Sequence, residues 1–251
     1  MDKTLGVIIL AAGKGTRMKS DLPKVLHKVA GKSMVSYVIA CAMHLTRDHI
    51  HVVVGHQAQK VRQEVAARFA VNFCVQEQLL GTGDAVKSAL PHLAAPVQDV
   101  LVLCGDVPLI QPQTLMDLVQ AHQNSGAAVT VLATDVENPF GYGRIIQDQQ
   151  GQVLAVREEA DASDAEKKIS RVNTGIYCFD RHFLSRALDL LRPDNRQGEY
   201  YLTDVVDIGV QNKEKIAVRV LADHRQVMGI NTLDELEKAQ NLISGVENEL
   251  P

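Results

Sequence analysis

The chain reads Leu5-Gly6-Val7-Ile8-Ile9-Leu10-Ala11-Ala12-Gly13-Lys14-Gly15-Thr16-Arg17-Met18 near its N-terminus. The apolar run Leu5–Leu10 is typical of a strand that is buried on both faces, and a glycine-rich turn follows it directly. Because strands of this kind occur where helices cover both faces of a sheet, the stretch favours an α/β protein.

Outward from this stretch, apolar runs alternate with helical patterns as far as residue 135. Further strands are expected at Ile50–Gly55, Val71–Val75, Asp99–Cys104 and Ala127–Thr134. Helices are expected between them at Met34–Leu45, Gln57–Phe69, Asp84–Leu93 and Gln113–Asn124. The alternation predicts an α/β fold with a Rossmann-like, mostly parallel sheet and helices on both faces.

The pattern changes after residue 135. Gly141–Gln147 and Gln152–Arg157 flank the polar turn Asp148–Gly151 and are expected to form a β-hairpin. The remaining elements are expected to be strands at Asn173–Phe179 and Ile216–Leu221 and helices at Arg181–Leu191, Asp204–Gln211 and Thr232–Ser244. We expect residues 136–200, approximately, to be an insertion that lays extra strands over one edge of the main sheet. The main domain would then span residues 1–230, followed by a C-terminal helix and tail at 231–251.

The charge balance excludes partners that bind through a general electrostatic attraction. Among 251 residues, Lys and Arg number 26 and Asp and Glu number 30, so the formal net charge is -4. Such a chain is not drawn to nucleic acid or to an anionic membrane, and neither is expected as a partner. A phosphate ligand would therefore need a local cluster of positive charge.

The cysteines and the N-terminus indicate a cytoplasmic protein. The four cysteines, Cys41, Cys74, Cys104 and Cys178, have no CxxC spacing and are expected to be reduced thiols rather than disulfides or zinc ligands. The first apolar run is too short for a signal peptide and far too short to span a bilayer.

The glycine-rich turn has the composition of a polyphosphate-binding loop. It matches neither GxxxxGK[ST] nor GxGxxG, but small residues at positions 11–13 and Gly15 would let backbone N–H groups approach phosphates closely. Arg17 and Lys24 add positive charge beside it. The alternative is a tight strand-to-helix turn with exposed basic residues.

Ten short blocks along the chain resemble, in their order, the signature of sugar-nucleotide pyrophosphorylases. Within that superfamily the chain is most similar to the uridyltransferase domain of the bacterial bifunctional N-acetylglucosamine-1-phosphate uridyltransferases. The blocks lie at residues 10–18, 20–27, 30–32, 76, 80–83, 105–109, 141–145, 173–175, 198–204 and 229–231. Together they span nearly the whole chain, although each block would be weak alone.

The resemblance implies a fold, a reaction and a set of site residues. The fold would be that of the nucleotide-diphospho-sugar transferases, with the insertion as a β-rich sugar-binding lobe. The reaction would be transfer of UMP from UTP to N-acetylglucosamine 1-phosphate with Mg²⁺. By position, Arg17 and Lys24 would be catalytic, and Asp106 and Asn231 would bind the metal. The nucleotide would contact Leu10, Ala11, Ala12, Gly13, Gly15, Thr16, Gln76, Gly81 and Thr82, and the sugar would contact Gly143, Glu158, Asn173 and Thr203.

The metal assignment agrees with the local sequence but does not follow from it. Asp106 comes just after a predicted buried strand, and open α/β sheets bind ligands at the carboxyl ends of their strands. A carboxylate suits Mg²⁺, which binds few protein groups together with substrate phosphates. The alternatives are that Asp106 caps a turn before Pro108 and that Asn231 belongs to the N-cap region of the last helix.

The nucleotide and sugar assignments also have plainer alternatives. The Gln76 amide has the donor and acceptor that the uracil edge requires, but Gln76 could simply end a strand, with Thr82 capping the next helix. Glu158 and Asn173 could hydrogen-bond sugar hydroxyls or an N-acetyl group. Glu158 could equally lie on a solvated charged face, and Asn173 could serve a turn.

Two features depart from the family pattern. Cys104 stands where a tyrosine is expected before Gly105-Asp106, which puts the identity of the sugar in doubt more than the reaction. No hexapeptide repeats follow residue 231, so the acetyltransferase β-helix of the bifunctional relatives is expected to be absent. Without it, a monomer or a weak homo-oligomer is expected.

The sequence leaves two alternative functions open. The chain could act on another sugar phosphate or another nucleoside triphosphate, or it could be a non-catalytic nucleotide-sugar binding protein. The presence of Arg17, Lys24, Asp106 and Asn231 argues against a mere binder, because binding does not require the full charge-neutralising set.

Overall fold

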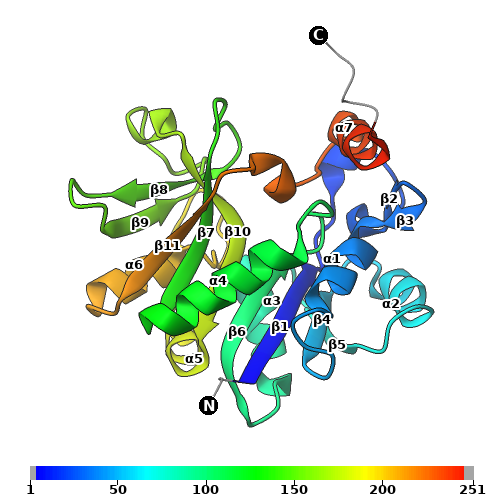
Figure 1. Ribbon diagram of the computed structural model, residues 1–251, viewed down its shortest axis with the longest axis horizontal. Coiled ribbons are helices and arrows are strands. Elements are labelled where there is room, and N and C mark those ends of the chain that lie inside the picture. Colours follow the sequence, from blue (N-terminus) through cyan, green and yellow to red (C-terminus); the bar gives the residue numbers. More distant parts are fainter. Residues whose placement is uncertain (1–3, 246–251) are drawn as a thin grey trace.

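The structure is a computed structural model that describes residues 4–245. Its centre is a twisted sheet of nine strands, seven of which form one continuous row (Figure 1). In spatial order these are β11 (Ile216–Leu221), β7 (Val129–Asp135), β10 (Arg171–Asp180), β6 (Val97–Cys104), β1 (Thr4–Ala11), β4 (Ile50–Val54) and β5 (Asn72–Val75). The sheet is mostly parallel, as predicted, and β10 alone runs antiparallel to its two neighbours in this row.

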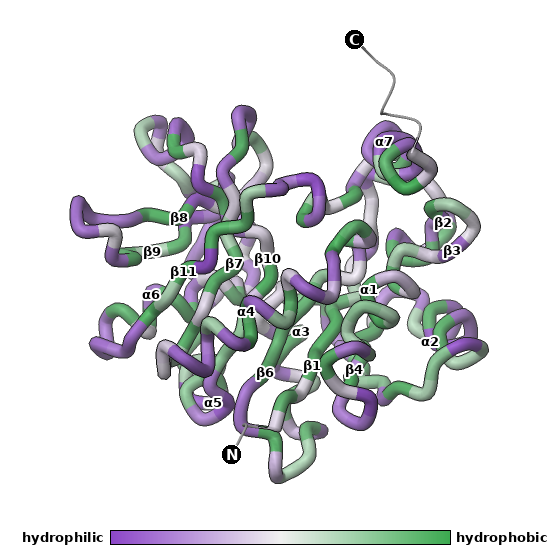
Figure 2. The backbone as a smooth tube through the Cα atoms, in the orientation of Figure 1, coloured by the Kyte–Doolittle hydropathy of each residue, from purple (hydrophilic) through white to green (hydrophobic). Residues whose placement is uncertain are grey.

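Helices cover both faces of the sheet, which confirms the predicted fold class. One face packs against α3 (Thr82–Ala89), α5 (Arg181–Leu190) and α6 (Asp204–Gln211). The other packs against α1 (Met34–Ala42), α2 (Ala58–Ala66) and α4 (Pro112–Ser125). Strand β1 shows why its sequence is apolar throughout, since Ile8 belongs to the first core and Val7 and Ile9 belong to the second. Figure 2 shows the hydrophobic residues gathered in these central strands.

The predicted hairpin forms, but the expected place of the strand after it was wrong. Strands β8 (Gly143–Gln147) and β9 (Val153–Arg157) pair with each other, and β8 also pairs with the beginning of β10. We expected β10 to be an extra strand over one edge, whereas it lies inside the main row between β6 and β7. Its buried run Ile176–Phe179 joins both cores, and only a central position buries both faces of a strand.

The sequence prediction also missed a small element near the N-terminus. Strands β2 (Lys28–Val29) and β3 (Lys32–Ser33) form a two-stranded hairpin whose turn residues, Ala30 and Gly31, both have positive φ. Helix α7 (Leu233–Ser244) packs on this hairpin through a separate core that contains Val29, Met34, Ile230 and Ala239. Figure 1 shows that α7 lies on one side of the carboxyl ends of β1 and β6, and that the β8–β9 hairpin lies on the other side.

Candidate active site

The candidate site begins where β1 and β6 end side by side. Leu10 pairs with Cys104 across the two strands, and the N–H of Gly105 donates to the carbonyl of Leu10 at 2.9 Å. The segments that follow, residues 12–24 and 105–111, therefore leave the sheet at the same edge. This is the edge at which open α/β sheets bind their ligands.

The glycine-rich loop is shaped by one left-handed residue. Gly15 has a φ of 61°, and a Cβ at this position would lie 2.4 Å from Cβ of Lys24. Only glycine therefore lets the loop pass so close to Lys24. The 3₁₀ turn Thr16–Met18 follows and buries Met18, while Arg17 stays exposed. The exposed backbone around Gly13 is free to approach a ligand, since a Cβ there would meet nothing within 4 Å.

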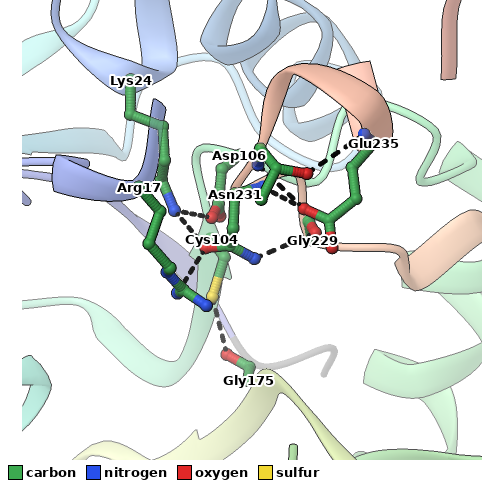
Figure 3. A network of polar contacts seen from close by, with 9 residues as sticks. Arg17, Lys24, Cys104, Asp106, Gly175, Gly229, Asn231 and Glu235 are labelled. Atoms are coloured by element: carbon green, nitrogen blue, oxygen red, sulfur yellow. Dashed lines mark hydrogen bonds and ion pairs between the residues drawn. The ribbon is translucent and has the colours of Figure 1, made fainter. Parts of the chain in front are cut away.

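Four of the predicted site residues converge at this edge, although they come from three distant parts of the sequence (Figure 3). The Lys24 ammonium forms an ion pair with Asp106 and donates to Oδ1 of Asn231 at 2.9 Å. The Arg17 guanidinium donates to the same oxygen at 2.8 Å. The N–H of Ile230 donates to the carbonyl of Asp106 at 3.0 Å, which ties the two metal candidates together through the backbone. With two cations against one carboxylate, this group carries an excess of positive charge, which suits the binding of phosphates. We call Arg17, Lys24, Asp106 and Asn231 the phosphate cluster.

The donor set of this cluster fits a hard divalent cation. Oδ2 of Asp106 and Oδ1 of Asn231 both face the ammonium of Lys24, so two oxygens already converge on one positive charge. Within residues 4–245, His, Cys, Asp and Glu side chains form no group of three or more that could hold a metal. A metal at Asp106 and Asn231 would therefore take most of its ligands from phosphates and water, as Mg²⁺ does.

The residues predicted to read the base lie at the end of β5 and the start of α3. The buried Gln76 amide donates to the carbonyl of Gly81 at 3.0 Å and to Asp84 at 2.7 Å. Gly81 has a φ of 117°, and a Cβ on it would lie 2.6 Å from the Tyr200 carbonyl oxygen. The alternative that Thr82 caps α3 is wrong, because Gly81 is the N-cap; the Thr82 hydroxyl instead accepts the N–H of Leu202 at 3.0 Å.

The four residues predicted to bind the sugar also come together. The Thr203 hydroxyl donates to Glu158 at 3.1 Å. A Cβ on Gly143 would lie 3.5 Å from both the other carboxylate oxygen of Glu158 and Cβ of Asn173. Glu158 is partly buried rather than lying on an open, solvated face, and this burial raises the pKa of its carboxyl. Asn173 serves a turn as well, since its side chain accepts the N–H of Gly175 at 3.1 Å.

Cys104 lies between the phosphate cluster and the proposed sugar-binding residues, because it interacts electrostatically with Lys24, Asp106 and Glu158. Its thiol donates to the carbonyl of Gly175 at 3.4 Å, and a Cβ on Gly175 would lie 2.9 Å from the sulfur. Burial raises the pKa of the thiol to about 12. Cys104 therefore stays protonated and packs as a small apolar group, not as a nucleophile.

Two residues that fix the backbone beside the site, Glu235 and Arg144, were not predicted as site residues from the sequence. Glu235 accepts backbone N–H groups at the start of α7, and the spacing Thr232-x-x-Glu235 of a capping box could have revealed it. Arg144 is almost fully buried; it binds the Tyr142 carbonyl, pairs with Glu159 at 2.7 Å and so fixes the turn before Gly143. Arg144 lies in the block at residues 141–145 that resembles the family signature, but its local sequence pattern does not predict that it is buried.

Comparison with known proteins identifies the family of this chain. The profile of a family described as nucleotidyl transferase matches residues 6–225. The bifunctional protein GlmU of Geobacter metallireducens is 48% identical over 235 residues, which make up 94% of this chain and 49% of the relative. The GlmU proteins of Desulfotalea psychrophila and Syntrophomonas wolfei are 44% and 43% identical over 95% and 97% of this chain, and 70% and 54% of their own lengths.

The present chain thus spans about half the length of most of these relatives. Within residues 4–245, every helix is too short or too polar to cross a membrane. Nucleotidyltransferases of this kind generally use a divalent metal ion, with which the oxygens of Asp106 and Asn231 are compatible. Because the family profile covers most of the chain and the relatives match nearly all of it, this chain belongs to the nucleotidyl transferase family.

Proposed function

We propose that this chain transfers UMP from UTP to N-acetylglucosamine 1-phosphate and releases pyrophosphate. The observation that carries the proposal is the convergence of Arg17, Lys24, Asp106 and Asn231 at the carboxyl ends of β1 and β6. Similarity to the GlmU proteins over more than nine-tenths of the chain supports the choice of substrates, given the sequence resemblance to N-acetylglucosamine-1-phosphate uridyltransferases.

The nucleotide is proposed to lie over the glycine-rich loop. Backbone N–H groups of the exposed loop around Gly13 and Gly15 approach the triphosphate, with Leu10, Ala11, Ala12 and Thr16 beside them. The uracil is read near Gln76, Gly81 and Thr82. The Nε2 group of Gln76 already donates to Gly81 and Asp84. The Oε1 of Gln76 would therefore be the atom that accepts the N3–H of the base.

The reaction needs no general base. A phosphate oxygen of the sugar 1-phosphate attacks the α-phosphorus of UTP in line, the new P–O bond forms, and the bond to the bridging oxygen of the leaving pyrophosphate breaks. Arg17 and Lys24 neutralise the charge that gathers on the α-phosphoryl oxygens and on the leaving group. Mg²⁺, held by Asp106 and Asn231, would supply further charge neutralisation when bound.

The sugar is proposed to lie between β8, β10 and the start of α6. Gly143, Glu158, Asn173 and Thr203 present one carboxylate, one amide and one hydroxyl on a short arc of the site. These groups hydrogen-bond the sugar hydroxyls and the N-acetyl group. Burial disfavours the charge of Glu158, so a sugar hydroxyl that donates to its carboxylate compensates for lost water.

Pyrophosphate release with a panel of the four common nucleoside triphosphates and several sugar 1-phosphates tests this proposal. We expect UTP with N-acetylglucosamine 1-phosphate to give the highest kcat/KM, and no release without a divalent metal. Preference for glucose 1-phosphate, or for another triphosphate, would leave the reaction class but contradict the substrate assignment. No release with any pair would contradict the enzymatic function itself.

We also propose a cytoplasmic location and a monomer or weak homo-oligomer. All four cysteines are free thiols, as is usual in reducing compartments. Sedimentation of the purified chain at micromolar concentration tests the oligomeric state, and fractionation of cells tests the location.

A further inference from the structure

Helix α7 begins with a capping box that has one additional hydrogen bond. The Thr232 hydroxyl accepts the N–H of Glu235 at 3.2 Å, and the Glu235 carboxylate accepts the N–H of Thr232 at 2.9 Å. These two bonds make the ordinary reciprocal cap. The same carboxylate oxygen of Glu235 also accepts the N–H of Asn231, and this bond is the shortest of the three at 2.7 Å. Glu235 therefore holds one residue more than the cap requires.

That additional residue, Asn231, is a member of the phosphate cluster. In Figure 3, Asn231 lies with Glu235 on one side and Arg17 and Lys24 on the other. Oδ1 of Asn231 accepts from both cations, and its Nδ2 donates to the carbonyl of Gly229 at 3.1 Å. The amide is thus oriented at both ends, with its oxygen toward the site.

Glu235 is in turn fixed to the rest of the molecule. Helix α7 buries Ala239 against Val29, Met34 and Ile230 in a core that includes the β2–β3 hairpin, and Leu236 packs against the same core. Glu235 is half-buried on this side of the helix. The position of the Asn231 backbone therefore depends on a helix that itself contributes no residue to the phosphate cluster.

We propose that Glu235 is a positioning residue, which holds the backbone of Asn231 so that its amide oxygen is correctly placed for the metal ion. The inference rests on the proposed function, since it assumes that Asn231 binds the metal. Glu235 acts through hydrogen bonding to Asn231 and not through its charge. Partners that orient a metal ligand in this way typically change metal affinity by about 10-fold to 100-fold.

The test measures binding of Mn²⁺ by electron paramagnetic resonance in the presence of UTP and without sugar phosphate, so that no turnover occurs. Glu235→Ala should raise the dissociation constant of Mn²⁺ by about 10-fold or more. Glu235→Gln keeps an acceptor of the same reach and should stay within about threefold of the parent. Glu235→Asp keeps the charge but shortens the reach, and should weaken Mn²⁺ binding as Glu235→Ala does.

Thr232→Ala is the matched control for the stability of α7. It removes the other half of the capping box but leaves the bond between Glu235 and Asn231 in place. It should lower the melting temperature, because it also loses part of the cap, and it should leave Mn²⁺ affinity near that of the parent. Pyrophosphate release should follow Mn²⁺ affinity, with the Mg²⁺ concentration for half-maximal rate raised in the Ala and Asp variants alone.

Three outcomes would overturn the inference. Mn²⁺ affinity unchanged in Glu235→Ala would show that Asn231 is placed without it, and Glu235→Asp gives the same answer if the alanine variant does not fold. Equal losses in Glu235→Ala and Thr232→Ala would assign the effect to helix stability. A loss in Glu235→Gln as large as in Glu235→Ala would assign it to charge. If the parent itself bound no Mn²⁺ with UTP, the proposed function would fail instead.

Discussion

Lys24 is the central residue of the phosphate cluster. Its ammonium contacts both proposed metal ligands, Asp106 and Asn231, and the left-handed Gly15 leaves room for its side chain. The ammonium of Lys24 therefore lies between the two oxygens that are proposed to bind the metal ion. We expect the triphosphate to draw the ammonium toward its own oxygens, which frees those of Asp106 and Asn231.

Asp106→Ala should remove nearly all activity while the fold persists. Losing one preorganised charge interaction typically lowers kcat by about 10²–10³-fold, and losing the metal ion that depends on it should cost more. Rates of pyrophosphate release at saturating Mg²⁺ measure the effect, and circular dichroism checks the fold. A variant that turned over within about threefold of the parent would contradict the metal assignment.

Lys24→Ala and Arg17→Ala should each lower kcat more than they weaken binding of the sugar phosphate. Both cations are expected to act on charge that develops in the transition state and on the leaving pyrophosphate. Steady-state kinetics with the sugar phosphate varied at saturating UTP separate the two effects. A rise in the KM for the sugar phosphate alone would place that cation at the other substrate.

At the scale of elements, the segment Tyr200–Thr203 before α6 joins the two halves of the site. The N–H of Tyr200 donates to the carbonyl of Leu80 at 2.7 Å, and the N–H of Gly83 donates to that of Tyr200 at 2.8 Å. Thr203 at the other end of the segment binds Glu158. One stretch of four residues therefore connects the proposed base-binding turn to the proposed sugar-binding carboxylate.

Helix α6 begins with Asp204, a carboxyl group whose ionisation is disfavoured in the folded chain. Burial, together with the nearby Asp207, raises the pKa of Asp204 to about 6. A carboxyl whose pKa is higher in the folded chain than in the unfolded one favours folding at low pH. That advantage is lost as the pH rises from about 4 to about 6, and the cost of the charge persists above this range.

Asp204→Asn should therefore stabilise the protein at pH 7.5 but not at pH 4. Because Asp204 is half-exposed, we expect a gain of about 1 kcal/mol, or about 2–4 °C in Tm for a chain of this size. Thermal unfolding of the variant and the parent at both pH values measures the difference. An equal change in Tm at the two pH values would show that ionisation of Asp204 is not its cause.

At the scale of the whole molecule, all residues of the proposed site lie within one chain and around one sheet. A polypeptide of residues 1–251 should therefore catalyse uridyl transfer without help from other domains. It should not transfer an acetyl group from acetyl-CoA to glucosamine 1-phosphate, because an acetyltransferase β-helix would need several stacked repeats. Thiol release from acetyl-CoA tests the second statement, and any rate above background would contradict it.

Light scattering at micromolar concentration should give the mass of a monomer, or of a weak homo-oligomer that dissociates on dilution. A stable trimer would mean that the α/β domain has an assembly surface of its own.

The bounds of most helices and strands could be predicted from the sequence, because they depend on interactions between near neighbours. Apolar runs placed β1, β4 and β6 within a residue or two, and the turn Asp148–Gly151 predicted the β8–β9 hairpin. The family resemblance likewise identified Arg17, Lys24, Asp106 and Asn231 as a group before their positions were known. Periodicity and turn chemistry act over a few residues, so both can be read without a structure.

The arrangement of these elements required the folded chain, because it depends on contacts between distant segments. Strand β10 has the same apolar pattern whether it lies at an edge or between β6 and β7, and only pairing with both neighbours fixes its place. Arg144 belongs to a family block, but its burial and its ion pair with Glu159 are visible only in the folded chain. The role of Glu235 depends on the direction of Asn231, which is set by Arg17 and Lys24 from more than 200 residues away.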